Sequence, residues 1–318
     1  MITYTYLKNC PICDSSDCNL VINTKDDKLY NLNLLKESNS LFNKYVDVPL
    51  KVYQCQKCSF SYLNPRLSDE SLNRLYHDLY QTDYYESRIS NKEHQYSGYY
   101  KIIAKYLKKD APALLDFGCS TGIFLGIAQK NGCKVMGIEL SNKAAESAKS
   151  KFGGNRIING SLNEFKNINE KFDVITFNNV LEHLDNPKTY LKIAADKLSQ
   201  DGLIFIVVPN FNSLKRVIMK DKWSLLLHEH INYFSNSSMK YLIKQHGLQL
   251  IESGSINHEV LDTSIFSKVK NKQTPKKSAP GGQKDSLWKL AFLALITDLS
   301  GILFNQGNFS YYLIKKVP

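Results

Sequence analysis

A glycine-rich turn follows an apolar strand near the middle of the chain and could bring backbone amides close to a ligand. Residues 114–117 read LLDF, glycines stand at Gly118 and Gly122, and a helical pattern begins at Ile123. Glycine allows backbone to approach a ligand closely, and a helix N-terminus attracts anions. Counted from Gly118, a dinucleotide fingerprint would need glycine at Ser120 and Ile123. The turn is therefore predicted to bind another ligand.

Two histidines flank a carboxylate at His228, Glu229 and His230, shortly after an apolar run that reads as a strand. This position, beyond the carboxyl end of a strand, is where α/β sheets place their sites, and imidazole titrates near neutral pH. The segment could therefore supply a general base. Two other interpretations remain: the histidines could fix the loop before Tyr233, or they could hold a metal, although the sequence shows no third ligand.

Four of the seven cysteines form two C-x-x-C pairs, Cys10 with Cys13 and Cys55 with Cys58. In a reducing compartment, such spacing favours metal over disulfides, and four thiolates suit tetrahedral zinc. A zinc ion with four protein ligands has no open position, so we predict a structural site. A redox pair, unligated thiols and Cys18 as a substitute ligand are the alternatives.

The elements that must position these groups follow from the change of pattern along the chain. Residues 1–67 are expected to form a zinc-binding module, residues 68–111 a helical connector or cap, and residues 112–318 an α/β domain. In that last part, short apolar runs alternate with amphipathic helices, which is typical of a doubly wound, mostly parallel sheet. The expected strands are 113–117, 134–139, 172–178 and 203–209, with a terminal strand at 309–314. The expected helices are 123–131, 143–151, 179–184, 188–198 and 237–246.

The glycine turn resembles the first motif of the class I S-adenosylmethionine-dependent methyltransferases, D-x-G-x-G-x-G, with Ser120 in place of the middle glycine. The stretches 172–184 and 198–206 also resemble the fourth strand and the fifth-strand entry of that family. The resemblance covers about residues 112–270 and implies a Rossmann-like fold that binds S-adenosylmethionine. It implies that Glu139, 23 residues after Asp116, accepts hydrogen bonds from the adenosine ribose. The implied cofactor-binding residues are Asp116, Gly118, Cys119, Ser120, Gly122, Glu139, Leu140, Ser161, Leu162 and Asn178.

The segment from His228 to Ser235 resembles the H-E-H-x-x-Y-F-S signature of methyltransferases that carry an N-terminal zinc module. Those enzymes act on nucleotide-linked sugars or related polysaccharide precursors, some of them at carbon. The resemblance implies that His230 is the base, with His228 and Glu229 beside it. His183 either faces the acceptor or stabilises its loop.

Composition and charge indicate the class of protein and the partners to expect. Its 318 residues include 43% hydrophobic and 22% charged residues, which is typical of globular proteins, and the net charge is +11. The positive charge is spread in short lysine clusters, so it gives a nucleic-acid partner little support. The N-terminus has no basic segment followed by an apolar one, and we expect a cytoplasmic protein.

The C-terminal part contains a lysine-rich loop at 271–283 and an apolar helical insertion at 287–304. With Lys289 and Asp298 inside it, this helix is not expected to span a membrane. We expect it to pack on the sheet or on the partner of a homodimer, with peripheral contact to the inner face of an anionic membrane as the alternative.

The resemblance implies a methyltransferase whose acceptor is a small molecule, a sugar nucleotide or glycan precursor of cell-surface polysaccharide synthesis. The methylated atom could be either an oxygen or a carbon. The alternatives are an RNA or protein methyltransferase, or a scaffold that binds the cofactor without catalysis.

Overall fold

The computed structural model describes residues 2–24, 48–79, 89–256 and 307–317. The predicted loop at 271–283 and the predicted apolar helix at 287–304 lie outside these ranges. Among the described residues, no helix is long and apolar enough to cross a lipid bilayer.

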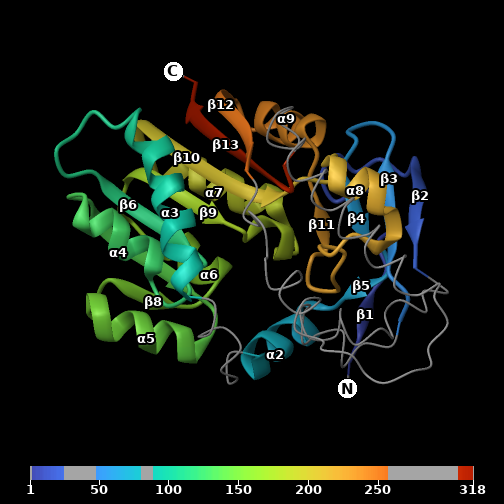
Figure 1. Ribbon diagram of the computed structural model, residues 1–318, viewed down its shortest axis with the longest axis horizontal. Helices are drawn as coiled ribbons and strands as arrows, with labels where there is room; N and C mark the ends of the chain where they lie inside the picture. The colour runs from blue at the N-terminus through green and yellow to red at the C-terminus, as the bar shows by residue number, and fades with distance from the viewer. Residues whose placement is uncertain (1, 25–47, 80–88, 257–306, 318) are drawn as a thin grey trace, which may run out of the picture.

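A seven-stranded sheet forms the larger part of the molecule, in the order β12-β13-β10-β9-β6-β7-β8 (Figure 1). Its strands are β6 (Ala113–Phe117), β7 (Lys134–Glu139), β8 (Ile157–Asn159), β9 (Phe172–Asn178), β10 (Leu198–Pro209), β12 (Leu248–Ile256) and β13 (Phe309–Lys316). β13 runs antiparallel to both of its neighbours, and the other pairs are parallel. The predicted doubly wound, mostly parallel sheet is therefore confirmed.

Helices cover both faces of this sheet, because neighbouring residues of a buried strand point to opposite sides. Leu114 and Val174 pack in one cluster with α3 (Ile89–Ala104), α4 (Ile123–Lys130) and α5 (Asn142–Phe152). Leu115 and Ile175 pack on the other face, with α6 (Leu162–Asn167), α7 (Pro187–Lys197) and α9 (Asn236–Gln245). The near-continuous apolar runs in the sequence are the result of this two-sided burial.

The N-terminal part forms a second, four-stranded sheet in the order β11-β4-β3-β2. Three of its strands belong to the cysteine-containing region, β2 (Cys18–Asn23), β3 (Lys51–Cys55) and β4 (Ser61–Leu63). The fourth, β11 (Asn232–Tyr233), comes from far along the chain and begins two residues after His230. The short strands β1 (Tyr4–Thr5) and β5 (Arg66–Leu67) pair beside this sheet, and α2 (Asp69–Leu79) follows β5.

One core joins the two sheets. The buried cysteines Cys10, Cys55 and Cys58 belong to the same apolar cluster as one face of the large sheet. Within it, the ring of Phe60 in the N-terminal module lies 5.1 Å, centroid to centroid, from that of Phe234, which follows β11. The N-terminal module is therefore packed on the large sheet.

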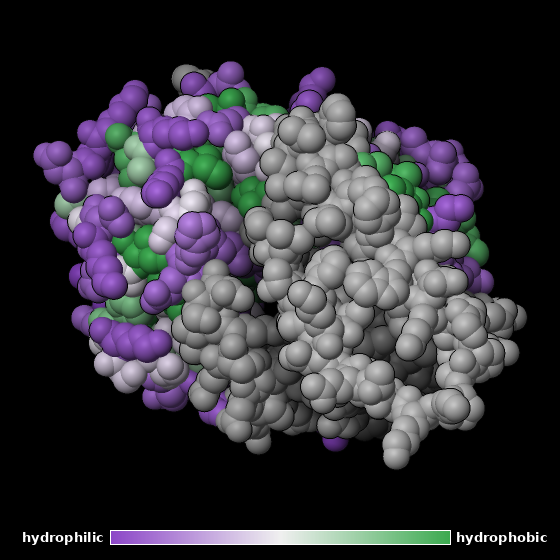
Figure 2. Space-filling model, in the orientation of Figure 1, coloured by the Kyte–Doolittle hydropathy of each residue, from purple (hydrophilic) through white to green (hydrophobic). Residues whose placement is uncertain are grey.

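The surface in Figure 2 is mostly hydrophilic over the helices of the large sheet. A more apolar surface appears at the upper right, beside β2 and α8 (Leu214–Met219). These two elements contribute four exposed apolar side chains, those of Leu20, Val21, Val217 and Ile218.

Candidate functional site

The glycine turn between β6 and α4 has the backbone that its sequence predicts. Gly118 and Gly122 have φ angles of 76° and 81°, and Ser120 between them also adopts a left-handed conformation, with φ of 51°. A Cβ atom at Gly118 would lie 2.6 Å from Cγ2 of Val180. Both the backbone conformation and the close packing therefore require glycine at Gly118.

Glu139 lies at the end of β7, and its carboxylate faces this turn. Its Oε2 accepts a hydrogen bond from the backbone N–H of Ser120 and its Oε1 accepts one from that of Ser141, both at 2.8 Å. Burial raises the pKa of Glu139, and these backbone donors oppose the shift. Each oxygen keeps a further lone pair, so the carboxylate can still accept hydrogen bonds from two ligand hydroxyls.

Asp116 is buried at the end of β6, next to the turn. Its Oδ1 accepts hydrogen bonds from Oγ1 of Thr176 at 2.6 Å and from Nδ2 of Asn178 at 3.1 Å. Burial raises the pKa of Asp116 to about 7, although these two donors lower it. The sequence did not single out Thr176; its place two residues before Asn178 on the neighbouring strand β9 is the signal that could have found it.

The other predicted cofactor residues lie around the same edge of the sheet. Cys119 packs over Gly137 of β7, where an added Cβ would lie 2.6 Å from its sulfur, and burial raises its pKa well above the usual value. Its thiol is thus a packing group. Leu140, which is 38% exposed, follows Glu139, and Ser161 caps α6, which begins at Leu162.

The structure brings His230 together with two residues from the loop after β9. Glu182 and His183 lie in a short 3₁₀ turn, η4 (Leu181–His183), and the rings of His183 and His230 are 4.8 Å apart, centroid to centroid. One ligand atom from each of Glu182, His183 and His230 lies within 4.8 Å of the other two. His228 is buried but is not part of this group. The side chains that accompany His230 therefore come from a distant loop, and His228 is not one of them.

The sequence predicts imidazoles that titrate near neutral pH, but burial keeps both rings neutral well below that range. It lowers the pKa of His183 to about 4 and that of His230 to about 3, and the proximity of His183 adds to the shift at His230. Burial also lowers the pKa of His228 to about 4. In the opposite direction, burial raises the pKa of Glu182 to about 8. A neutral imidazole has a free lone pair, so each of these rings can accept a proton or hold a metal.

β11 fixes the position of His230. The strand pairs with β4, and its Asn232 side chain donates hydrogen bonds to the carbonyl oxygens of Leu181, at 3.0 Å, and Leu184, at 2.6 Å. The segment after His230 is thus held both by the N-terminal sheet and by the loop that carries Glu182 and His183.

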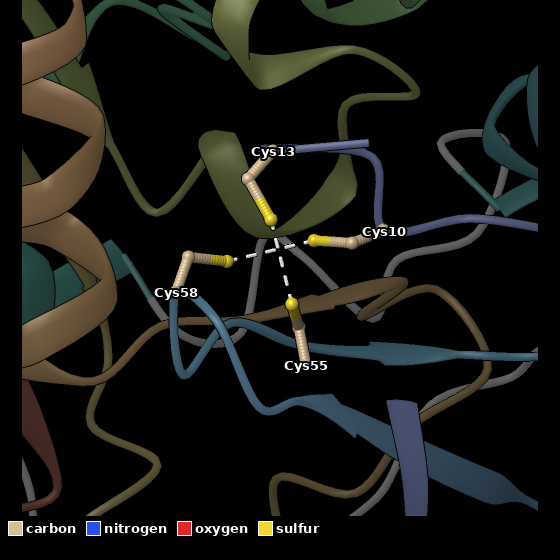
Figure 3. A group of neighbouring side chains, drawn as sticks. All are labelled: Cys10, Cys13, Cys55 and Cys58. Atoms are coloured by element: carbon tan, nitrogen blue, oxygen red, sulfur yellow. Dashed lines mark hydrogen bonds between the residues drawn. The ribbon is translucent and has the colours of Figure 1, made fainter. Parts of the chain in front are cut away.

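The four predicted metal-binding cysteines converge in the N-terminal module (Figure 3). The sulfurs of Cys10 and Cys58 are 3.5 Å apart, and those of Cys13 and Cys55 are 3.4 Å apart. All four sulfurs lie within 4.8 Å of one another. Four sulfurs around one zinc ion, each at about 2.3 Å, need spacings of this size, so the donor set and its geometry fit tetrahedral zinc.

Comparison with known proteins identifies the family. Residues 90–253, about half of the chain, match the family model described as a methyltransferase domain. The chain belongs to this family. It is an S-adenosylmethionine-dependent methyltransferase, as the resemblance of the glycine turn implies. The match begins within α3, in the region expected from the sequence to be a connector.

Curated relatives are similar over the same region. The mitochondrial ubiquinone biosynthesis O-methyltransferase of Schizosaccharomyces pombe is 27% identical over 124 residues, covering 37% of this chain and 43% of the relative. The ubiquinone biosynthesis O-methyltransferase of Pelagibacter ubique is 26% identical over 162 residues, covering 48% of this chain and 67% of the relative. This methyltransferase thus spans less than half of the first relative's length.

Solved structures show the same fold. A methyltransferase from Archaeoglobus fulgidus that depends on the same cofactor superposes with a TM-score of 0.52 at 15% identity, over 74% of this chain and all of that one. A chain from the complex between the Haloferax volcanii Trm112 methyltransferase activator and the putative methyltransferase gives 0.53 at 12% identity, over 76% of this chain and 97% of that one.

Replacement of Glu139 by alanine is expected to weaken S-adenosylmethionine binding about 100-fold or more. Two charge-assisted hydrogen bonds to the ligand would be lost, each contributing about 1.5–3 kcal/mol. Isothermal titration calorimetry measures the change, and Glu146→Ala on the exposed face of α5 is the matched control. An unchanged dissociation constant in Glu139→Ala would refute the proposed ribose contact.

Replacement of Asp116 by asparagine is expected to change how stability depends on pH. The folded-state pKa of Asp116, about 7, is above its ordinary value of 3.8, so its contribution to stability is complete below about pH 4 and is lost as the pH rises through 7. Relative to Asp116→Asn, the wild type should therefore lose up to about 4 kcal/mol of unfolding free energy between pH 4 and pH 9.

Urea denaturation at several pH values tests this expectation. Asp173→Asn is the control of opposite sign: burial raises the pKa of Asp173, but hydrogen bonds from Lys109 and Ser199 outweigh burial and lower it overall. The contribution of Asp173 to the free energy of unfolding should be lost only at acidic pH. Parallel pH profiles for the wild type and Asp116→Asn would contradict the assignment of a buried, titrating carboxyl group.

Proposed function

We propose that this methyltransferase methylates a hydroxyl group of a small molecule, a sugar nucleotide or another glycan precursor. The observation that carries the proposal is the neutral, buried His183–His230 pair at the same edge of the sheet as the glycine turn and Glu139. The relatives named as O-methyltransferases support oxygen as the methylated atom. The H-E-H-x-x-Y-F-S segment supports a sugar acceptor, through its likeness to enzymes of polysaccharide synthesis.

The residues of the glycine turn fit the proposed cofactor-binding set. Glu139 would hold the ribose hydroxyls, Gly118 and Gly122 would allow close approach of the backbone, and Asp116 would order the turn with Thr176 and Asn178. Leu140, Ser161 and Leu162 would border the adenine, and Cys119 would pack beneath the turn. When bound, S-adenosylmethionine supplies a methyl group attached to a positively charged sulfur, which leaves as a neutral thioether.

His230 is proposed to remove the proton of the acceptor hydroxyl. Its Nδ1 lies 2.9 Å from the carbonyl oxygen of Leu225, which can only accept, so Nδ1 carries the hydrogen and Nε2 carries the lone pair. General-base catalysis by a positioned imidazole contributes about 10²–10⁴-fold to a rate. His228 and Glu229 would act by fixing the loop that carries His230.

The four cysteines are proposed to bind one structural zinc ion, within a module that spans residues 1–67. The module would act on catalysis through its sheet: β3 ends at Cys55, β4 pairs with β3, and β11 pairs with β4 immediately after the His230 loop. Residues 68–111 would then connect this module to the domain formed by residues 112–318. We place the protein in the cytoplasm, where reduced cysteines and nucleotide sugars are both found.

A product assay tests the proposed function. Purified protein, S-adenosylmethionine and a panel of nucleotide sugars would be incubated together, and mass spectrometry would detect acceptors that gain one methyl group. His230→Ala should lower turnover about 10²–10⁴-fold without changing cofactor affinity. His94→Ala, on the exposed side of α3, is the matched control.

Two results would contradict the proposal. Full activity of His230→Ala would return His230 to a structural role. Methylation of RNA or of protein side chains by this enzyme, with no methylated sugar nucleotide, would replace the acceptor class.

Replacement of Cys55 by serine is expected to remove the zinc ion and to lower turnover, because the loss of a ligand loosens the sheet that holds β11. Atomic emission would measure zinc per chain, and the product assay would measure turnover. Cys133→Ser is the matched control, because Cys133 is buried against α3 and α4, away from the cysteine cluster. Retention of zinc in Cys55→Ser would contradict the four-cysteine site.

A further inference from the structure

The cluster of Glu182, His183 and His230 has the composition of a second metal site. Two residues come from η4, after β9, and the third precedes β11, so the fold joins two segments that are far apart in the sequence. The three ligand atoms lie within 4.8 Å of one another. Two imidazole nitrogens and one carboxylate oxygen form a donor set that holds zinc in hydrolytic enzymes and ferrous iron in oxygenases.

The hydrogen bonds of both histidines leave the correct nitrogen available. Nδ1 of His183 lies 2.8 Å from the carbonyl oxygen of Glu229, and Nδ1 of His230 lies 2.9 Å from that of Leu225. Since a carbonyl oxygen cannot donate, each Nδ1 must carry the hydrogen, and each Nε2 presents its lone pair. Metal-binding histidines are held by this kind of contact, in which the nitrogen that does not bind the metal donates to a backbone carbonyl.

Glu182 supplies an independent observation that points to a cation. Its side chain is only 1% exposed, and its Oε2 has no hydrogen-bond partner among the described residues. Its Oε1 lies 3.9 Å from Nε2 of His183, too far for a hydrogen bond, and no lysine or arginine in the described ranges forms an ion pair with it. The charged form of such a buried carboxyl group is costly, and a bound cation would remove that cost.

We propose that Glu182, His183 and His230 bind one divalent transition-metal ion, at a site separate from the four cysteines. Nitrogen ligands favour zinc, cobalt, nickel or ferrous iron over magnesium and calcium, which prefer oxygen. Bonds of about 2.0–2.2 Å in a tetrahedral arrangement place two ligands of one ion about 3.4 Å apart. Oε1 of Glu182 and Nε2 of His183 are 3.9 Å apart, so these two side chains need to approach by about half an ångström.

The site has a consequence for catalysis that rests on the proposed function. The lone pair of His230 Nε2 cannot accept a proton while it holds a cation. If His230 is the base, occupation of the site should inhibit methyl transfer, and chelation should restore it. The metal site itself is defined by binding and does not require any activity.

Cobalt titration of the full chain tests the inference, after a chelator has removed weakly bound ions. Cobalt bound to nitrogen and oxygen gives visible absorption without the intense thiolate bands of a cysteine site, so the spectrum distinguishes the two sites. The wild type should bind one such equivalent. Glu182→Gln and His183→Gln should lose it, and His94→Gln, a control at an exposed histidine of α3 outside the cluster, should keep it.

Stability measurements separate loss of binding from loss of folding. Glu182→Gln replaces the buried carboxyl group by an uncharged amide of the same size and should leave the metal-free melting temperature nearly unchanged. Cobalt should then raise the melting temperature of the wild type and of His94→Gln, but not that of Glu182→Gln. Absence of the nitrogen-and-oxygen spectrum in the wild type, or its persistence in Glu182→Gln and His183→Gln, would overturn the site.

The activity arm separates this inference from the proposed function. Inhibition by zinc that disappears in Glu182→Gln supports both. If cobalt binds at the cluster and increases the rate of methyl transfer, the metal site is supported and the role of His230 as a base is overturned. Methyl transfer that follows the proposal, with no cobalt binding at the cluster, would overturn the metal site alone.

Discussion

The parallel pairing of β6 with β7 and β9 is the constraint on which the rest of the site depends. Parallel strands end at one edge, so Asp116, Glu139 and the loop with Glu182 meet there although the sequence separates them. Helices on both faces then bury these carboxyl groups. Burial explains why their pKa values rise, and why each needs hydrogen-bond donors, a ligand or a cation to compensate it.

A second pairing ties the two parts of the molecule together. β11 contributes the outer strand of the N-terminal sheet, while Asn232 within it binds the loop after β9. The cysteine cluster and His230 are therefore connected through three hydrogen-bonded strands. A small module with four buried or half-buried thiols can in this way fix the position of a histidine that lies outside it.

Much of the fold could be predicted because its pattern is local. The strands at 113–117, 134–139 and 172–178 were predicted with the bounds that the structure shows, since each is an apolar run next to an amphipathic helix. β10 begins at Leu198, whereas the strand was predicted from residue 203. The residues between these positions are mostly polar and include a register shift, so they lack the apolar pattern of a buried strand. Three strands were not predicted. β8 has three residues, β11 has two, and β12 contains many polar residues, so each carries little periodic signal.

The sequence by itself determined the family and the glycine turn, because these depend on residue types at fixed spacing, and it predicted the role of Glu139 and the grouping of the four cysteines. Only the tertiary structure decided what surrounds His230. Glu182 and His183 are 48 and 47 residues before it, and the hydrogen bonds from Asn232 of β11 to their loop hold the two segments together. It also decided that His228 stands outside the cluster. His228 and His230 are the same residue type in one loop, two positions apart. Sequence alone therefore could not show which of the two imidazoles faces the buried Glu182, because that depends on the folded backbone.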